Sequence, residues 1–156
     1  MKITEYITEV RPGEHEIEEF CRFSQTQLPE DYKAFLKNEN GGRPDPCNFR
    51  LTNHNGGLEE GGVDFFLALY DGKIGSLKMT FTNFKGRLPA GFLAIGRDPF
   101  GNLILLKTSG DNFGKIYFWD HEKEDSEPTL NNVFFVSDSF SEFIGNLFHY
   151  VITETP

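Results

Sequence analysis

The sequence predicts a single-domain α+β fold, in which helices near both termini pack on one face of a mainly antiparallel sheet. Apolar residues recur at helical spacing near both ends of the chain, within residues 11–44 and 139–151. Between them, short apolar runs alternate with Gly- and Pro-containing turns, a pattern typical of strands joined by hairpins. No linker, repeat or low-complexity segment divides the 156 residues, so we expect residues 1–156 to form one domain.

Two short helices are expected near the N-terminus. In "RPGEHEIEEFCRFSQTQ", Ile17 and Phe20 mark an apolar stripe at helical spacing. In "LPEDYKAFLKNENGGRP", Pro29 and Glu30 suit the first turn of a second helix. The glycine pair before Pro44 then ends that helix.

The middle of the chain predicts strands. We expect them at Asn48–Leu51, Val63–Tyr70, Phe92–Ile95, Leu103–Lys107, Lys115–Trp119 and Val133–Val136. The turn signals "HNGG", "EEGG", "DGK", "LPAG", "DPFGN" and "SGDNFG" separate these runs. The charged segment "DHEKEDSEPTLNN" is interpreted as a surface loop.

The stretch at 97–122 could instead be a ligand loop, but its residues favour hairpin turns. "DPFGN" has Pro99 and Phe100 where a calcium loop needs oxygen ligands. "SGDNFGK" is followed by Ile116, where a phosphate-binding loop needs a hydroxyl. We therefore expect no metal or phosphate here.

A third helix is expected at the C-terminus. Ser139 and Glu142 fit a capping box, in which each side chain bonds a free backbone N–H of the other residue. Apolar residues then recur at helical spacing as far as Val151. This helix should lie against the sheet.

The charge excludes some partners. The formal net charge of −9 disfavours nucleic acid and anionic lipid, and would attract a basic protein, although it could also serve solubility alone. No apolar run is long enough to span a membrane, and the N-terminus carries charges where a signal peptide is apolar. We expect a cytoplasmic protein with Cys21 and Cys47 reduced.

The sequence contains no strong catalytic motif. The four histidines lack the spacing of a helical zinc site. The neighbouring carboxylates of Glu59 and Glu60, or of Asp120 and Glu122, could act as an acid–base pair, but their hydrophilic loops favour solvated side chains. We expect no enzyme, metal or cofactor; a hydrolase that uses the carboxylates of residues 120–127 would need a deep cleft there.

Trp119, the single tryptophan, ends the run "IYFWD". Its position suits an aromatic residue at the rim of the core, whose indole N–H finds a partner or water. The alternative is an anchor in a protein interface, where tryptophan is enriched.

Four segments together resemble the SUKH superfamily, which includes yeast cell-wall-assembly regulators and many bacterial immunity proteins. They are "LPEDYKAFLKNENGG", "LPAGFLAIGRDPFGNLILL", "GKIYFWDHE" and "FVSDSFSEFIGNL", in this order over about residues 14–150. Gly96, Gly101, Trp119 and Asp120 fall on residues typical of the family, whereas Asp138 stands where many members have a small residue. The resemblance implies a sheet flanked by helices and no catalytic residues.

The resemblance also implies a function. Bacterial members bind and neutralise toxin domains, often nucleases; fungal members are regulatory scaffolds within longer chains. We expect a non-catalytic immunity-type protein with a basic, nuclease-like toxin as partner, and a scaffold domain as the alternative. The acidic balance directs the partner-binding prediction to acidic loops and Trp119: Glu59, Glu60, Asp64, Trp119, Asp120, Glu122, Glu124, Asp125 and Glu127.

Overall fold

The computed structural model describes residues 1–150, which form a curled antiparallel sheet with four helices. The strands are β1 (Lys2–Glu5), β2 (Arg43–Asp45), β3 (Asn48–Thr52), β4 (Leu58–Gly62), β5 (Phe65–Phe66), β6 (Phe92–Arg97), β7 (Leu103–Lys107), β8 (Ile116–Trp119) and β9 (Val133–Ser137). The helices are α1 (Glu14–Ser24), α2 (Glu30–Asn38), α3 (Leu77–Asn83) and α4 (Phe140–Gly145), with a 3₁₀ turn η1 (His121–Lys123).

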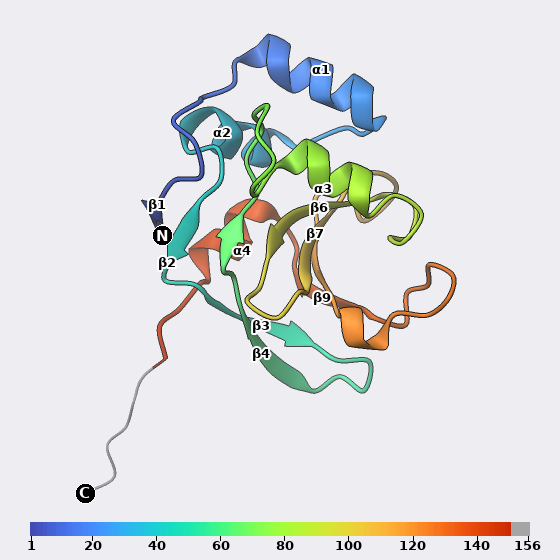
Figure 1. The fold of residues 1–156 in the computed structure, drawn as a ribbon. Coiled ribbons are helices and arrows are strands. Elements are labelled where there is room, and N and C mark those ends of the chain that lie inside the picture. Colours follow the sequence, from blue (N-terminus) through green and yellow to red (C-terminus); the bar gives the residue numbers. More distant parts are fainter. Residues whose placement is uncertain (151–156) are drawn as a thin grey trace, which may run out of the picture.

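The main sheet has seven strands in the order β4-β3-β9-β8-β7-β6-β5, and every neighbouring pair is antiparallel. Strands β6 to β9 follow one another through hairpin connections, which confirms the prediction of turns within residues 97–122. Strands β1 and β2 form a separate two-stranded sheet. In Figure 1, α1, α2 and α3 gather at one side of the molecule, and the β3–β4 hairpin lies at the opposite side.

Helices from both ends of the chain pack on one face of the sheet, as predicted. On this helix-covered face, Phe49 of β3 lies 6.0 Å from Phe118 of β8 and 5.5 Å from Phe143 of α4, measured between ring centroids. Phe140 of α4 lies 5.2 Å from Tyr32 of α2. Burial of these rings stabilises the contact between helices and sheet.

The opposite face, here called the second face, is covered only in part. Side chains alternate along a strand, so Trp119 of β8 points away from its neighbour Phe118. The ring of Phe84, at the end of α3, packs against Trp119 with a centroid distance of 5.6 Å. Helix α3 was not predicted from the sequence; its start is marked by Ser76, whose side chain accepts a hydrogen bond from the N–H of Met79 at 3.1 Å.

The C-terminal helix is shorter than predicted, because α4 ends at Gly145. Glycine and Asn146 are poor helix formers, and the N–H of Asn146 bonds the carbonyls of Glu142 and Phe143 to close the last turn. The chain then runs beside β3, where Phe148 and Asn48 exchange backbone hydrogen bonds of 2.9 and 3.1 Å. Val151, the last residue of the predicted helix, lies outside the described residues.

Two predictions about the strands were wrong. The "EEGG" segment, predicted as a turn, belongs to β4, where each residue from Leu58 to Gly62 pairs with β3. The strand predicted at Val63–Tyr70 is reduced to Phe65–Phe66, and the remainder has no regular structure apart from an isolated bridge at Ala68.

Candidate protein-binding surface

Two acidic segments that lie far apart in the sequence meet at one hollow of about 210 Å³. Glu59 of β4 and Asp120, directly after β8, both line it. Asp98 and Phe100, from the turn between β6 and β7, also line it. Lys123 is the basic residue of the lining. We call this feature the acidic hollow.

The turn between β6 and β7 is fixed by its own aspartate. The Asp98 carboxylate accepts hydrogen bonds from the N–H of Phe100 at 2.8 Å, the N–H of Asn102 at 2.8 Å and the Asn102 side-chain amide at 2.7 Å. Asp98 is therefore buried, whereas the side chain of Phe100 at the tip of the turn is 77% exposed. Phe100 was not among the residues predicted to bind a partner, although a bulky apolar residue between Pro99 and Gly101 in a turn indicates an exposed apolar contact.

The segment after β8 is bonded to the same turn. The N–H of His121 donates to the side-chain oxygen of Asn102 at 3.0 Å. The Asp120 carboxylate accepts from the N–H of Glu122 at 3.0 Å and so begins η1. The side-chain amide of Asn132 donates to the carbonyl of Asp120 at 2.9 Å, which ties both ends of the loop together. The acidic hollow is thus built on a rigid framework.

The predicted partner-binding carboxylates differ in how free they are. Within residues 1–150, the side chains of Glu59, Glu122 and Glu127 are exposed and form no hydrogen bond or ion pair. These carboxylates can therefore pair with a partner without first breaking a contact within residues 1–150.

The other predicted carboxylates have intramolecular partners. Glu124 is paired with Arg87, and Asp64 with Arg43. The Asp125 carboxylate accepts hydrogen bonds from Thr129 at 2.9 Å and Asn131 at 3.1 Å.

Glu60, next to Glu59 on β4, points to the other side of the strand, since side chains alternate. Hydrogen bonding to Glu60 is the main cause of the raised pKa of the Tyr150 phenol. Glu60 also lines the acidic hollow, but its carboxylate lies toward Tyr150.

Trp119 does not lie on the surface. It is 1% exposed and packs against Phe84, so it is a core residue in this structure and is more deeply buried than the expected position at the rim of the core. Its indole ring fills the space between the second face and the segment at the end of α3. Trp119 is therefore not part of the proposed surface.

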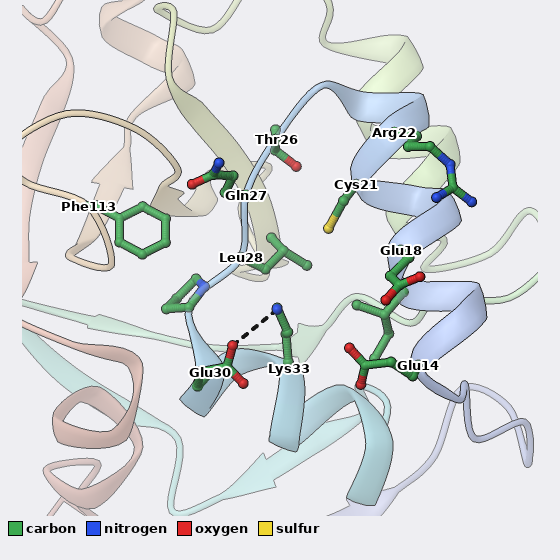
Figure 2. A pocket seen from close by; sticks show the side chains of 12 residues that line it. Glu14, Glu18, Cys21, Arg22, Thr26, Gln27, Leu28, Glu30, Lys33 and Phe113 are labelled. Atoms are coloured by element: carbon green, nitrogen blue, oxygen red, sulfur yellow. Dashed lines mark hydrogen bonds and ion pairs between the residues drawn. The ribbon is translucent and has the colours of Figure 1, made fainter.

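A second hollow, of about 520 Å³, lies between α1 and α2 (Figure 2). Cys21 points into it from α1, and burial raises the pKa of its thiol. A raised pKa keeps a thiol protonated and weakly nucleophilic at neutral pH. The nearby lysines are already paired, Lys33 with Glu30 at 3.1 Å and Lys37 with Glu14. This hollow therefore contains no activated nucleophile.

The described part of the chain offers few sites for other chemistry. Within residues 1–150, no three side chains of His, Cys, Asp or Glu are grouped so that they could hold a metal ion. Cys21 and Cys47 are free thiols. Among the helices of residues 1–150, none has the length and apolar character needed to cross a membrane.

Comparison with known proteins assigns the chain to a family. The model of the SMI1 / KNR4 family (SUKH-1) matches residues 12–146, from just before α1 to the end of α4. A search of curated proteins gave no match. The matched range contains most of the sequence and all seven strands of the main sheet. The chain therefore belongs to the SMI1/KNR4 family (SUKH-1).

Proposed function

We propose that this chain is a non-catalytic, immunity-type protein that binds and neutralises a basic, nuclease-like bacterial toxin domain in the cytoplasm. The observation that carries the proposal is the meeting of Glu59, Asp98 and Asp120 at one hollow, beside an exposed phenylalanine. The family membership supports a role in protein–protein interaction in general.

The charges at this surface suit a positively charged partner. Its carboxylates outnumber the single lysine of the lining, and the exposed Glu122 and Glu127 lie on the loop that begins at Asp120. Complementary charge of this kind raises association rates by about 10–10³-fold and weakens as salt is added. The paired acids Asp64, Glu124 and Asp125, and Glu60 beside Tyr150, add to the field around the molecule.

Phe100 provides the apolar part of the proposed contact. Its ring is exposed on a turn whose backbone is already fixed, so a partner can bury it without ordering the loop. Buried aromatic residues near the centre of an interface often carry most of the binding energy. A stable interface of about 1,600 Å² is larger than the hollow, so the neighbouring β3–β4 hairpin would also have to make contact.

The test measures association kinetics with a candidate toxin domain, chosen as the variable C-terminal domain of a large protein encoded beside this chain's gene. The test variant combines Glu59→Gln, Glu122→Gln and Glu127→Gln. Its matched control, Glu9→Gln with Glu18→Gln and Asp111→Asn, removes the same charge from exposed acids elsewhere on the chain. We expect the test variant to associate about tenfold more slowly at low salt with a flatter salt dependence, and the control to resemble the parent. Equal rates for both variants would contradict the proposed surface.

The regulatory scaffold remains the second candidate, because the family match does not separate immunity proteins from cell-wall regulators. Co-expression distinguishes them. An immunity protein restores growth to cells that produce the toxin domain, and the Phe100→Ala variant should restore it less well. Absence of both rescue and toxin binding would favour the scaffold.

A further inference from the structure

The second face of the sheet carries a row of aromatic side chains, and no residue from the helices of residues 1–150 lines the hollow above it. Phe92 of β6, Tyr117 of β8 and Phe135 of β9 lie side by side, with ring centroids 5.2 and 5.9 Å apart and edge-to-face geometry. Phe135 is 37% exposed. Helix α3 and the segment after it cover Trp119 on this face but leave the row open.

These rings form the floor of a groove of about 640 Å³. Pro89 and Ala90 line it from the segment before β6, and Leu130, 60% exposed, lines it from the loop before β9. The side chains of Asn53 and Asn112 also line it and can bond the backbone of a bound chain. The groove shares no lining residue with the acidic hollow.

The charge of the groove is opposite to that of the whole molecule. The chain contains 24 acidic residues, yet none of them lines the groove. The Lys107 ammonium lies 4.5 Å from the centroid of the Phe92 ring, and within residues 1–150 it forms no ion pair. At the flank, Lys115 lies 5.7 Å from the Phe135 ring and is paired with Asp138 at 3.5 Å. One cation in an apolar groove thus lacks a counter-charge.

We propose that this groove binds an extended segment of a protein partner in which an apolar side chain is followed closely by an acidic one. The apolar side chain would lie on Tyr117 and Phe135, and the carboxylate would pair with Lys107. A nucleic acid would need several cations for its phosphates, whereas the groove supplies one unpaired lysine within a chain of net charge −9. Because the groove is separate from the acidic hollow, the inference goes beyond the proposed function and does not depend on it.

The probe is a dodecapeptide selected from a random displayed library against the full chain, synthesised and labelled with fluorescein. Binding is measured by fluorescence anisotropy with the parent and with Lys107→Glu, Leu130→Ser and the control Lys73→Glu, which changes an exposed lysine outside the groove. We expect selected peptides to combine Leu, Ile or Phe with Asp or Glu. Lys107→Glu and Leu130→Ser should each weaken binding at least tenfold, while Lys73→Glu leaves it unchanged.

A selection in which no peptide is sensitive to either groove variant, including one that yields only Lys- or Arg-rich peptides bound at the acidic surface, or a library that yields no binder, would overturn the proposal. Two further measurements exclude other occupants. Binding of a labelled single-stranded oligouridine that is lost in Lys107→Glu would assign the groove to nucleic acid instead. A dimer of the parent that Leu130→Ser converts to a monomer would assign it to a second copy. Circular dichroism of each variant verifies that the fold is intact.

Discussion

The guanidinium of Arg87 holds the carboxylate of Glu124 through two hydrogen bonds, 3.0 Å from Nε to Oε2 and 2.9 Å from Nη2 to Oε1. The same guanidinium lies 4.4 Å from the ring centroid of Phe84 and 5.6 Å from that of Trp119. The loop after β8 is thereby joined to the segment after α3, directly above the buried tryptophan. Glu124, predicted as a partner-binding residue, has a structural role.

Glu124→Gln should lower the free energy of unfolding by about 0.5–1 kcal/mol at pH 7, a modest value because Arg87 is partly exposed. The hydrogen bond from Arg87 lowers the pKa of Glu124 in the folded state. The Arg87–Glu124 pair therefore stabilises the fold above the unfolded pKa of the Glu124 carboxyl, about 4.3. This stabilisation is lost as the pH falls through the folded pKa of Glu124. Urea unfolding at pH 7 and pH 3 should show a parent–variant difference that shrinks at pH 3. Glu127→Gln, at an exposed and unpaired position, is the control, and a difference independent of pH would contradict the assignment.

Asn40, at the end of α2, connects three segments of the chain. It is fully buried, with φ of 52°, and its side chain donates to the carbonyls of Val10 at 2.9 Å and Leu69 at 3.0 Å. Its side-chain oxygen accepts from the N–H of Leu69 at 2.8 Å. A Cβ on the next residue, Gly41, would lie 2.8 Å from the carbonyl oxygens of Phe66 and Leu67. The Asn-Gly-Gly motif thus holds the end of α2 against residues 66–69, at and just after β5.

Asn40→Ala should lower the free energy of unfolding by about 2–4 kcal/mol, because it leaves the backbone N–H and carbonyl of the buried Leu69 without their side-chain partner. Asn55→Ala, at an exposed turn position, should change it by less than about 0.5 kcal/mol. Chemical unfolding of the two variants checks the expectation. A similar effect for both would show that the Asn40 bonds contribute little.

Phe140 is the centre of an aromatic cluster on the helix-covered face. It is fully buried, and its ring lies 5.0 Å from Phe35 and 5.7 Å from Phe66. Phe140→Ala should cost about 3–5 kcal/mol through lost burial and the cavity left behind. Phe100→Ala removes the same side chain from an exposed turn and should leave the melting temperature nearly unchanged. Equal decreases in melting temperature for the two variants would contradict the central packing role of Phe140.

Ser139 begins α4 with a single cap bond, in which its hydroxyl oxygen accepts from the N–H of Glu142 at 3.0 Å. Of the two bonds of the predicted capping box, this one is formed. Ser139→Ala should therefore cost about 1 kcal/mol. Ser126→Ala, at an exposed loop position, should have no measurable effect in the same unfolding experiment.

The strands of the central hairpins could be predicted because their side chains are apolar and their turns carry strong signals. The predicted Leu103–Lys107 coincides with β7, and Val133–Val136 falls within β9. Strand β4 could not be predicted, because Glu-Glu-Gly-Gly has low strand propensity and is extended only through its pairing with β3.

The site was predictable only in part. The acidic residues were evident from composition, but their meeting depends on which strands become neighbours, a non-local property. Burial of Trp119 likewise depends on α3, whose short helix was missed because Gly75 and Asn83 surround it with turn signals. The identity of Glu124 as a structural residue required the position of Arg87, 37 residues away.

Strand β4 forms one edge of the main sheet, and within residues 1–150 no further strand pairs with its outer side, where another strand could add. If a second copy paired there, Glu59 and Glu60 would bring like charges together across the new ladder, which opposes self-association. The carboxylates that are proposed to attract a basic partner would then also keep unbound molecules apart. Replacing them with neutral residues should consequently be accompanied by a check for aggregation.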